Sequence, residues 1–329
     1  MPAPWSGRSV VATLERFQIS LYLLALAVGV VVGLAAPGAA PTLEHAINPV
    51  LIVLLYATFL AVPFARIGSA LRDVRFLGSA VALNFVAVPI VVFALTRFIA
   101  DDRAVLVGAV LVLCAPCIDY VIVFSGLAGA AAERLLACAP VLMLLQIVLL
   151  PLYLWLFVGP EVADTIEIAP FVEAFVLLIV VPMALAAATQ KVARRHRFAT
   201  TITDVMAAGM VPIMMTTLAV VVASQVDAVR ARWADLAGAA VVFVVFLVAM
   251  PVVGRLAADV ARLDVPAGRA LVFSGATRNS LVVLPLALAL PHALSLAPVV
   301  VVTQTLVELI GMIAYVRLVP HLVPTRAYG

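Results

Sequence analysis

The stretch CAPCIDYVIVFS, residues 114–125, is an apolar run interrupted by Pro116 and Asp119. Proline has no amide hydrogen to donate within a helical turn, so Pro116 predicts a break in a membrane helix. Backbone groups freed by such a break must be satisfied by protein, water or ligand, so the unwound segment would border a cavity. A simple proline kink is the alternative interpretation, since kinks are common in membrane helices.

A second interrupted run, SGATRNSLVVLP at residues 274–285, predicts a break at Ser274 and Gly275. It carries Arg278, the one basic residue that we place inside the membrane. An aspartate at the bilayer centre costs about 2.5 to 3.5 kcal/mol, so Asp119 needs a partner, a proton or water. We expect Asp119 and Arg278 to pair, either as a proton-responsive pair coupled to substrate or as a static salt bridge between crossing helices.

The composition is that of a polytopic membrane protein. Hydrophobic residues make up 66% of the 329 residues, charged residues 11%, and the mean hydropathy is +1.25, which excludes a soluble domain. We attribute the net charge of +3 to arginines on one side of the membrane and expect no nucleic-acid partner. Three cysteines and four histidines are too few and too scattered for a zinc site, so we expect free thiols and no cofactor.

Ten helical membrane spans are predicted from uncharged runs of about 20 residues, which can cross a hydrocarbon core of roughly 30 Å. The first run resembles a signal peptide, but it exceeds the usual apolar region of about 7 to 15 residues, so we keep it as a span. The spans are residues 18–36, 46–65, 76–98, 104–126, 135–158, 168–189, 201–225, 234–256, 270–290 and 294–319.

The basic residues outside the spans lie mainly on one side of the predicted topology. With a cytoplasmic N-terminus, fifteen arginines and lysines fall in inside segments, and four, Arg97, Arg103, Arg230 and Arg232, fall outside. The positive-inside rule therefore places both termini in the cytoplasm of a multi-pass protein of the cell membrane.

The two halves of the chain contain an internal repeat. APVLMLLQI in the fifth span resembles APVVVVTQT in the tenth at an offset of 158, which makes Gln146 and Gln304 equivalent. Pro89 and Pro251, in the third and eighth spans, match at an offset of 162. Because each half has five spans, the second half enters the membrane from the opposite side, and the repeat is inverted. Inverted repeats with paired broken helices are typical of secondary transporters.

The repeat also sets the predicted domain organisation. The offset of 158 aligns the two interrupted runs and places Tyr120 opposite Arg278. We therefore expect spans four and nine to be discontinuous helices that cross. The predicted segments are a cytoplasmic tail at 1–17, a five-helix repeat at 18–159, an external linker at 160–167, a second five-helix repeat at 168–320 and a cytoplasmic tail at 321–329.

Polar side chains inside the spans are the candidate substrate contacts. Glu308 lies one helical turn after Gln304 on the same face, although it could be a satisfied interfacial group. Cys117 follows Pro116, and its thiolate is a soft ligand suited to a thiophilic metalloid, whereas a packing role is the alternative. The candidate substrate-binding residues are Cys117, Asp119, Gln146, Arg278, Asn279, Gln304 and Glu308.

These features resemble the bile acid:sodium symporter superfamily, and within it the arsenite-efflux (arsenic-resistance permease) branch. The resemblance covers nearly the whole chain and rests on the repeat, on APC at 115–117, RNS at 278–280 and LVEL at 306–309. It implies that Cys117 contacts the metalloid and that Glu308 matches a tenth-span glutamate of the exporters. It also implies a core of spans three to five and eight to ten that moves against a panel of spans one, two, six and seven.

The chain departs from sodium-coupled members of that superfamily. They carry serine and asparagine after the fourth-span break and a glutamate opening the ninth-span motif, where this chain has Val121, Ile122 and Ser274. Arg278 stands where they carry glutamine, and its positive charge would repel a cation. Asp119 has no counterpart in the motif of the arsenite exporters. We therefore expect no sodium site, and either proton coupling or uniport.

The sequence and the resemblance predict a secondary active transporter that exports a metalloid oxyacid such as arsenite in exchange for protons. The alternative is a sodium- or proton-coupled carrier of bile-acid-like organic anions, which would hold a carboxylate with Arg278 and helix N-termini. An enzyme is disfavoured, because the sequence has no HExxH motif and we place no second aspartate inside the membrane beside Asp119. A sensor that binds substrate without transporting it is a third possibility.

Overall fold

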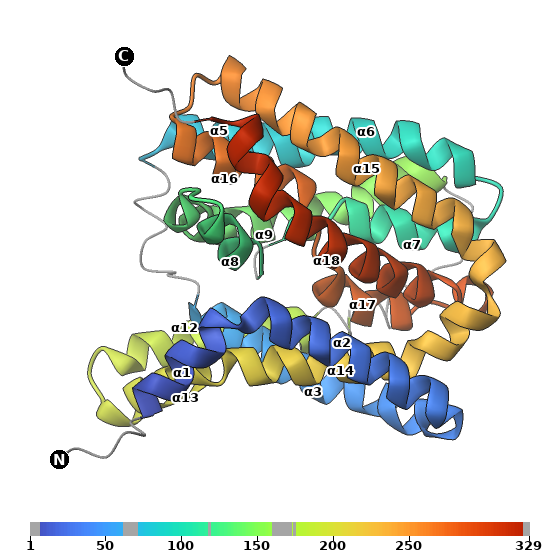
Figure 1. The fold of residues 1–329 in the computed structure, drawn as a ribbon, viewed down its shortest axis with the longest axis horizontal. Coiled ribbons are helices and arrows are strands. Elements are labelled where there is room, and N and C mark those ends of the chain that lie inside the picture. Colours follow the sequence, from blue (N-terminus) through green and yellow to red (C-terminus); the bar gives the residue numbers. More distant parts are fainter. Residues whose placement is uncertain (1–6, 62–71, 118–119, 160–172, 174–175, 325–329) are drawn as a thin grey trace. The chain divides into compact units, whose positions relative to one another are not determined.

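The computed structural model describes residues 7–61, 72–117, 120–159, 173 and 176–324 (Figure 1). Nearly all of these residues are helical, and no strand occurs among them beyond one isolated antiparallel bridge between Pro116 and Arg278. The predicted all-helical class is confirmed.

The chain divides into two compact units. The first comprises Met1–Ala61 and Glu173–Ala231, and the second comprises Val62–Val172 and Arg232–Gly329. The first unit thus holds predicted spans one, two, six and seven, and the second holds spans three to five and eight to ten. This is the same division into panel and core that the resemblance implies.

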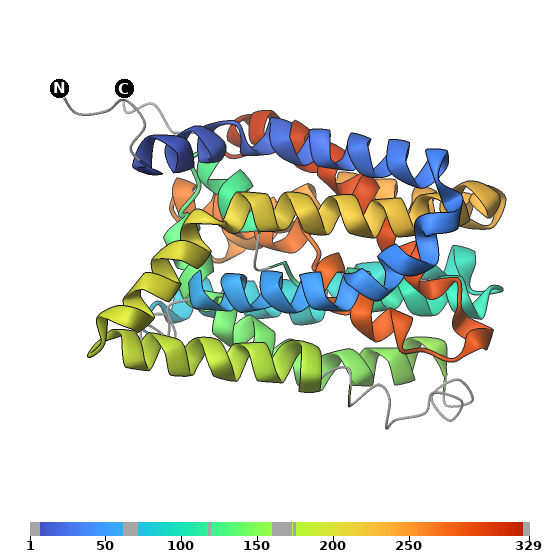
Figure 2. The same ribbon diagram turned by 90° about the horizontal axis from the view of Figure 1, so that it is seen from below.

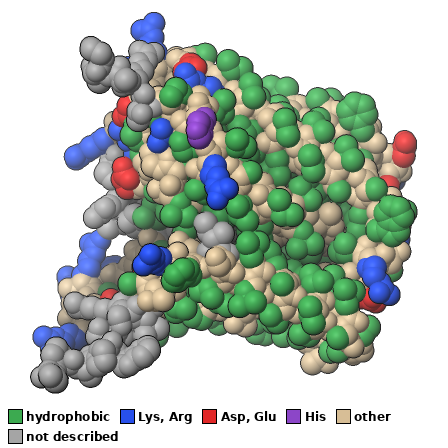
Figure 3. All heavy atoms as spheres, in the orientation of Figure 1, with side chains coloured by type: hydrophobic (Ala, Val, Ile, Leu, Met, Phe, Trp, Pro, Cys, Tyr) green, Lys and Arg blue, Asp and Glu red, His purple; other side chains and the backbone are tan. Residues whose placement is uncertain are grey.

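Long apolar helices dominate both units. Among the described residues, six are long and apolar enough to cross a membrane: Pro37–Ala61, Val74–Ile99, Ala132–Val158, Met210–Ala231, Trp233–Val260 and His292–Leu322. On the face of the second unit drawn in Figure 3, hydrophobic side chains cover most of the surface. Such an apolar surface is what contact with a lipid bilayer requires. The arrangement of ten spans in two inverted halves stays a prediction.

The helices of the first unit are α1 (Gly7–Arg16), α2 (Gln18–Ala35), α3 (Ala40–Ala61), α12 (Val181–Ala193), α13 (Arg197–Ala208) and α14 (Met210–Ala231). Figure 2 shows α14 lying between α2 and α3. A Cβ atom added at Gly33 of α2 would lie 2.5 Å from the carbonyl oxygen of Ala223 in α14. Small residues permit such close approach where lipid provides no hydrophobic driving force. Gly33 therefore sets the distance between α2 and α14.

The seventh predicted span begins later than the sequence indicates. Residues 201–225 were expected to form one span, but α13 ends at Ala208 and α14 begins at Met210. Gly209 separates the two helices, and its amide hydrogen bonds to the carbonyl oxygen of Val205, 2.9 Å away. The threonine-rich α13 is largely exposed on its polar side, which explains why hydropathy alone merged it with the apolar helix that follows.

The second unit contains nine α-helices and one π-helix among its described residues, together with short 3-10 segments. They are α5 (Val74–Ala82), η3 (Leu83–Ala87, a π-helix), α6 (Val88–Thr96), α7 (Arg103–Leu113), α8 (Tyr120–Leu127), α9 (Ala132–Val158), α15 (Trp233–Val260), α16 (Val265–Ala276), α17 (Ser280–Leu288) and α18 (Ala297–Leu322). Helix α7 packs closely on α18, because a Cβ atom at Gly108 would lie 2.7 Å from the carbonyl oxygen of Ala297.

Two tyrosines replace hydrogen bonds that prolines remove from the helices. A proline within a helix leaves the carbonyl four residues earlier without its usual donor. For Pro89 that carbonyl belongs to Phe85, and it accepts a hydrogen bond from the Tyr153 hydroxyl at 2.7 Å. For Pro251 it belongs to Leu247, and it accepts a hydrogen bond from the Tyr315 hydroxyl. Each tyrosine follows its acceptor by 68 residues, and the two arrangements lie 162 residues apart.

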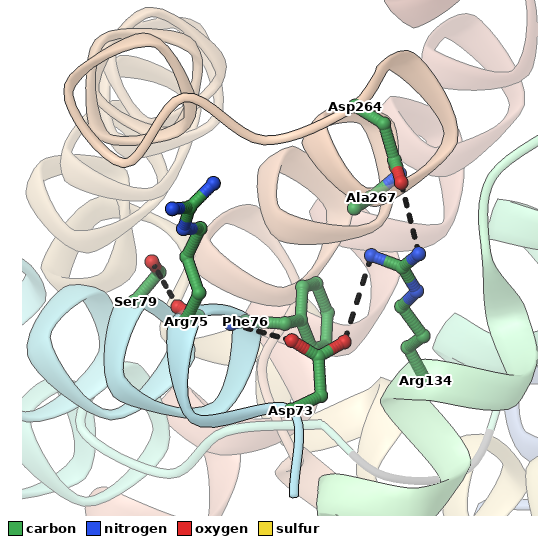
Figure 4. A network of polar contacts seen from close by, with 7 residues as sticks. All are labelled: Asp73, Arg75, Phe76, Ser79, Arg134, Asp264 and Ala267. Atoms are coloured by element: carbon green, nitrogen blue, oxygen red, sulfur yellow. Dashed lines mark hydrogen bonds and ion pairs between the residues drawn. The ribbon is translucent and has the colours of Figure 1, made fainter.

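Helix starts in the second unit are joined by an ion-pair network (Figure 4). Asp73 caps α5 by accepting a hydrogen bond from the amide of Phe76, and Asp264 caps α16 in the same way from Ala267. The Arg134 guanidinium lies between them, 2.8 Å from a carboxylate oxygen of Asp264 and 3.6 Å from one of Asp73. One side chain from α9 thus ties together the first turns of α5 and α16.

We expect Gly33→Ala to destabilise the protein by about 1 to 3 kcal/mol, because the new methyl group would overlap backbone atoms of α14. Gly78→Ala in α5 is the matched control, since a Cβ atom there meets no atom within 4 Å. The control should be neutral or stabilising by up to about 1 kcal/mol. Thermal unfolding in detergent measures both, and equal effects of the two substitutions would contradict the packing argument.

We expect Tyr315→Phe to cost about 1 to 3 kcal/mol, because it leaves the buried Leu247 carbonyl without a donor. Pro251→Ala restores a backbone amide that can donate to this carbonyl, so the same tyrosine substitution should cost less in that background. A double-mutant cycle by thermal unfolding measures the coupling. Additive effects of the two substitutions would show that the tyrosine does not replace the helical hydrogen bond.

Candidate functional site

Two pairs of short helices in the second unit frame the candidate site. Helix α7 ends at Leu113 and α8 begins at Tyr120, while α16 ends at Ala276 and α17 begins at Ser280. The predicted break residues Ser274 and Gly275 belong to the last turn of α16, so the second interruption falls just after them. Gly275 serves packing at this position, because a Cβ atom there would lie 2.6 Å from the Leu83 side chain.

The segments between these helices are joined by two backbone hydrogen bonds. The Cys117 amide donates to the carbonyl oxygen of Thr277 at 3.3 Å, and the Asn279 amide donates to that of Ala115 at 2.8 Å. They form the antiparallel bridge centred on Pro116 and Arg278. The crossing of the two interrupted segments is therefore a direct backbone contact.

The residues at the bridge are related in pairs by a constant spacing of 162 positions. Ala115 lies 162 residues before Thr277, and Cys117 lies 162 residues before Asn279, so each hydrogen bond maps onto the other. Arg278 is paired with Pro116 at this offset. The offset of 158, which aligned Tyr120 with Arg278, differs from this spacing by four residues and stays a prediction. The glutamine match behind it lies about one helical turn out of register with the crossing.

Glu308 binds the backbone at the start of the second interruption. Its carboxylate oxygens lie 2.9 and 3.1 Å from the amide nitrogen of Arg278, which donates to both. The Gln304 side-chain amide also donates to Glu308, one helical turn away in α18 as predicted. Glu308 is fully buried. A carboxylate thus accepts from a backbone amide that would donate to the Ser274 carbonyl in a continuous helix.

The Arg278 side chain folds back onto the ends of two helices. Its Nη2 atom lies 2.6 Å from the carbonyl oxygen of Ser274 and 2.8 Å from that of Gly275, both in the last turn of α16. Its Nη1 atom lies 3.3 Å from the carbonyl oxygen of Leu113, the last residue of α7. Arg278 is completely buried. Its positive charge faces the negative ends of both helix dipoles.

Asn84 also contacts Arg278, although sequence reasoning did not single out this residue. Its Oδ1 atom lies 2.9 Å from Nη2 of Arg278, and its Nδ2 atom donates to the Ser274 hydroxyl at 2.8 Å. The Phe246 ring lies 5.7 Å from the guanidinium carbon. Asn84 is fully buried in η3. The available signal was an asparagine inside the predicted span 76–98, since polar residues within membrane segments usually pair with other polar groups.

Three further polar side chains at the crossing are buried. Within the described part of the chain, the Asn279 Nδ2, Ser280 Oγ and Gln304 Oε1 atoms have no hydrogen-bond partner. Asn279 also caps α17, because its Oδ1 atom accepts from the amide of Val282 at 3.2 Å. These atoms offer amide, hydroxyl and carbonyl contacts to a small polar ligand.

Three of the predicted site residues remain to be placed: Cys117, Gln146 and Asp119. Cys117 is 3% exposed at the crossing, directly after Pro116. Gln146 is buried in α9. Asp119 lies outside the described residues, so its pairing with Arg278 stays a prediction. The described residues contain no cluster of three or more histidine, cysteine or acidic side chains that could hold a metal ion.

Comparison with known proteins gives the family of the chain. Residues 48–232, which are 185 of the 329 residues, match the family model described as Sodium Bile acid symporter family. No curated protein matches the chain. Members of this family are transporters, and several helices of this chain are suited to crossing a membrane. The chain therefore belongs to the Sodium Bile acid symporter family and is a multi-pass membrane protein.

Proposed function

We propose that this protein is a secondary active transporter that binds its substrate where the two interrupted segments cross. The observation that carries the proposal is the reciprocal pair of hydrogen bonds from Cys117 to Thr277 and from Asn279 to Ala115. Broken helices that meet at a repeat interface are where secondary transporters bind substrate. The family match supports transport as the activity.

The proposal includes ten spans in two inverted halves of five. Recurrence at an offset of 162 supports it, since the prolines and the tyrosines repeat at that distance, which also separates the bridged residues Pro116 and Arg278. Asp102 and Asp264 add a further pair, because each caps the helix that leads to an interruption. In this proposal both termini are cytoplasmic, and the halves are residues 18–159 and 168–320. The two compact units would be the parts that move during alternating access.

We favour a metalloid oxyacid such as arsenite as the substrate, with export as the direction. Cys117 lies at the crossing and would supply the soft sulfur ligand that a thiophilic centre prefers. The buried polar atoms of Asn279, Ser280 and Gln304 would bind the hydroxyl groups of a small neutral oxyacid. A site of this kind combines one thiol with several neutral hydrogen-bonding groups.

A bile-acid-like organic anion carried with sodium is the second candidate, because the family name points to it. Such a substrate would need a cation to hold its carboxylate. The Arg278 guanidinium already contacts carbonyl oxygens of Ser274, Gly275 and Leu113, and these contacts would have to break first. The surroundings of Arg278 therefore favour the neutral oxyacid over the carboxylate.

Proton coupling in this proposal depends on Glu308. The carboxylate accepts hydrogen bonds from the backbone of Arg278 and from Gln304. A proton on Glu308 would occupy one acceptor position and weaken its hold on the start of the second interruption. Substrate and proton would thus compete for the same few groups, so that binding of the substrate favours release of the proton. Asp119, whose structure is outside the described residues, is a further proton-binding candidate in the proposal.

We expect inside-out membrane vesicles that contain the protein to accumulate arsenite when a pH gradient is imposed. Cys117→Ser should lower the initial rate by at least about tenfold, since a hydroxyl is a poor ligand for a thiophilic centre. Cys138→Ser is the matched control, because Cys138 is also buried but lies in α9 away from the interrupted segments. Its rate should stay close to that of the wild type.

Absence of metalloid accumulation by folded wild-type protein would contradict the proposed substrate. The same vesicles should then be tested with organic anions in the presence and absence of a sodium gradient. Sodium-driven uptake of an organic anion would establish the second candidate in its place.

We expect Glu308→Gln to uncouple arsenite movement from the proton gradient, because a glutamine side chain does not ionise and cannot bind and release a proton as a carboxylate does. Downhill exchange of arsenite should persist, whereas accumulation driven by the pH gradient should be lost. Glu133→Gln in the first turn of α9 is the control, since Glu133 is exposed. Accumulation that survives in Glu308→Gln would assign the proton to another group.

A further inference from the structure

The end of α16 leaves two buried carbonyl groups without their helical donors. In a continuous helix, the carbonyls of Ser274 and Gly275 would accept from the amides four residues later. Those amides donate instead to Glu308 and to Ala115. Both carbonyls are buried at the negative end of a half-helix, where a positive group is favoured.

A single nitrogen atom of the Arg278 guanidinium contacts more oxygen atoms than it has hydrogen atoms to donate. Nη2 carries two hydrogens, yet the oxygens of Ser274, Gly275 and Asn84 lie within 2.6 to 2.9 Å of it. The Leu113 carbonyl lies 3.3 Å from Nη1. Oxygens that outnumber the hydrogens around a charged atom resemble the coordination shell of an ion more than a set of separate hydrogen bonds.

The chemistry of these oxygens suits a monovalent cation. Three are backbone carbonyls at the C-terminal ends of half-helices, and the fourth is the amide oxygen of Asn84. Hard cations prefer oxygen ligands, and helix C-termini together with unwound carbonyls are the groups that hold sodium in secondary transporters. The Phe246 ring, 5.7 Å from the guanidinium carbon, adds a further surface that attracts positive charge.

We infer that these oxygens form a cation site that the chain fills with its own side chain, the guanidinium of Arg278. The protein therefore has a permanently bound cation where a soluble ion could otherwise bind, and it needs no sodium at this position. Removal of the guanidinium would open the site to Na⁺ or to a free guanidinium ion. The consequence for coupling rests on the proposed transport function, whereas the site itself does not.

The experiment compares thermal unfolding of purified Arg278→Ala in sodium, potassium and choline chloride at one ionic strength, with and without millimolar guanidinium. The variant should be less stable than the wild type in choline chloride. Sodium or guanidinium should raise its melting temperature by a few degrees in a saturable manner, because an ion that binds only the folded state stabilises it. The wild type should melt at the same temperature in all three salts.

Arg269→Ala is the matched control. Arg269 also lies in α16 and donates to two backbone carbonyls, those of Val323 and Ala128, each at 3.0 Å. It lies near the start of the helix and is partly exposed, so its removal leaves carbonyls that water can reach. We expect no saturable rescue of this variant by sodium or by guanidinium.

A sodium-specific stabilisation of the wild type would overturn the inference, as would a folded Arg278→Ala that neither ion stabilises. If Arg278→Ala does not fold, Arg278→Gln takes its place under the same criteria, because glutamine keeps a donor and a similar apolar stem. The wild-type measurement needs no variant and decides by itself whether sodium binds. Since the readout is unfolding, a failure to transport arsenite would leave this result unchanged.

Discussion

The second unit depends on satisfying the backbone groups that two helix ends release inside an apolar core. An unsatisfied amide or carbonyl costs several kcal/mol in hydrocarbon, so a membrane helix can stop there only if partners are supplied. Here the partners come from the opposite segment, from Glu308 and from the Arg278 side chain. Each of these groups satisfies the backbone and also carries charge or polarity into the crossing. The same few groups therefore stabilise the helix ends and give the crossing its polar character.

At the crossing, the charged side chains of Arg278 and Glu308 each face a helix end whose dipole has the opposite sign. Carbonyl ends of α7 and α16 face the guanidinium of Arg278, and the carboxylate of Glu308 meets the amide just before α17. Positive charge at helix C-termini and negative charge at helix N-termini are the favourable placements. Removing either side chain would leave backbone dipoles uncompensated as well as hydrogen bonds unmade.

Much of this could be predicted from the sequence, because membrane composition and helix breakers act locally. Pro116 predicted an interruption, and Glu308 and Gln304 were placed together from helical spacing alone. The contribution of Asn84 could not be predicted, since its hydroxyl partner Ser274 lies 190 residues away. The glutamine motif repeats at an offset of 158, whereas the bridge at the crossing pairs Pro116 with Arg278, 162 positions apart, and a short motif in a helix can shift by a turn without changing which face is apolar. The pairing of Asp119 remains a prediction.

Two tyrosines donate to carbonyl groups that a proline leaves without a helical donor, and their spacing bears on how the chain evolved. Tyr153 follows Phe85 by 68 residues, and Tyr315 follows Leu247 by the same number. In the proposed repeat, a duplication that copied a proline together with its distant tyrosine would account for this agreement. The equal intervals would then mean that no net insertion or deletion has since separated either acceptor from its tyrosine.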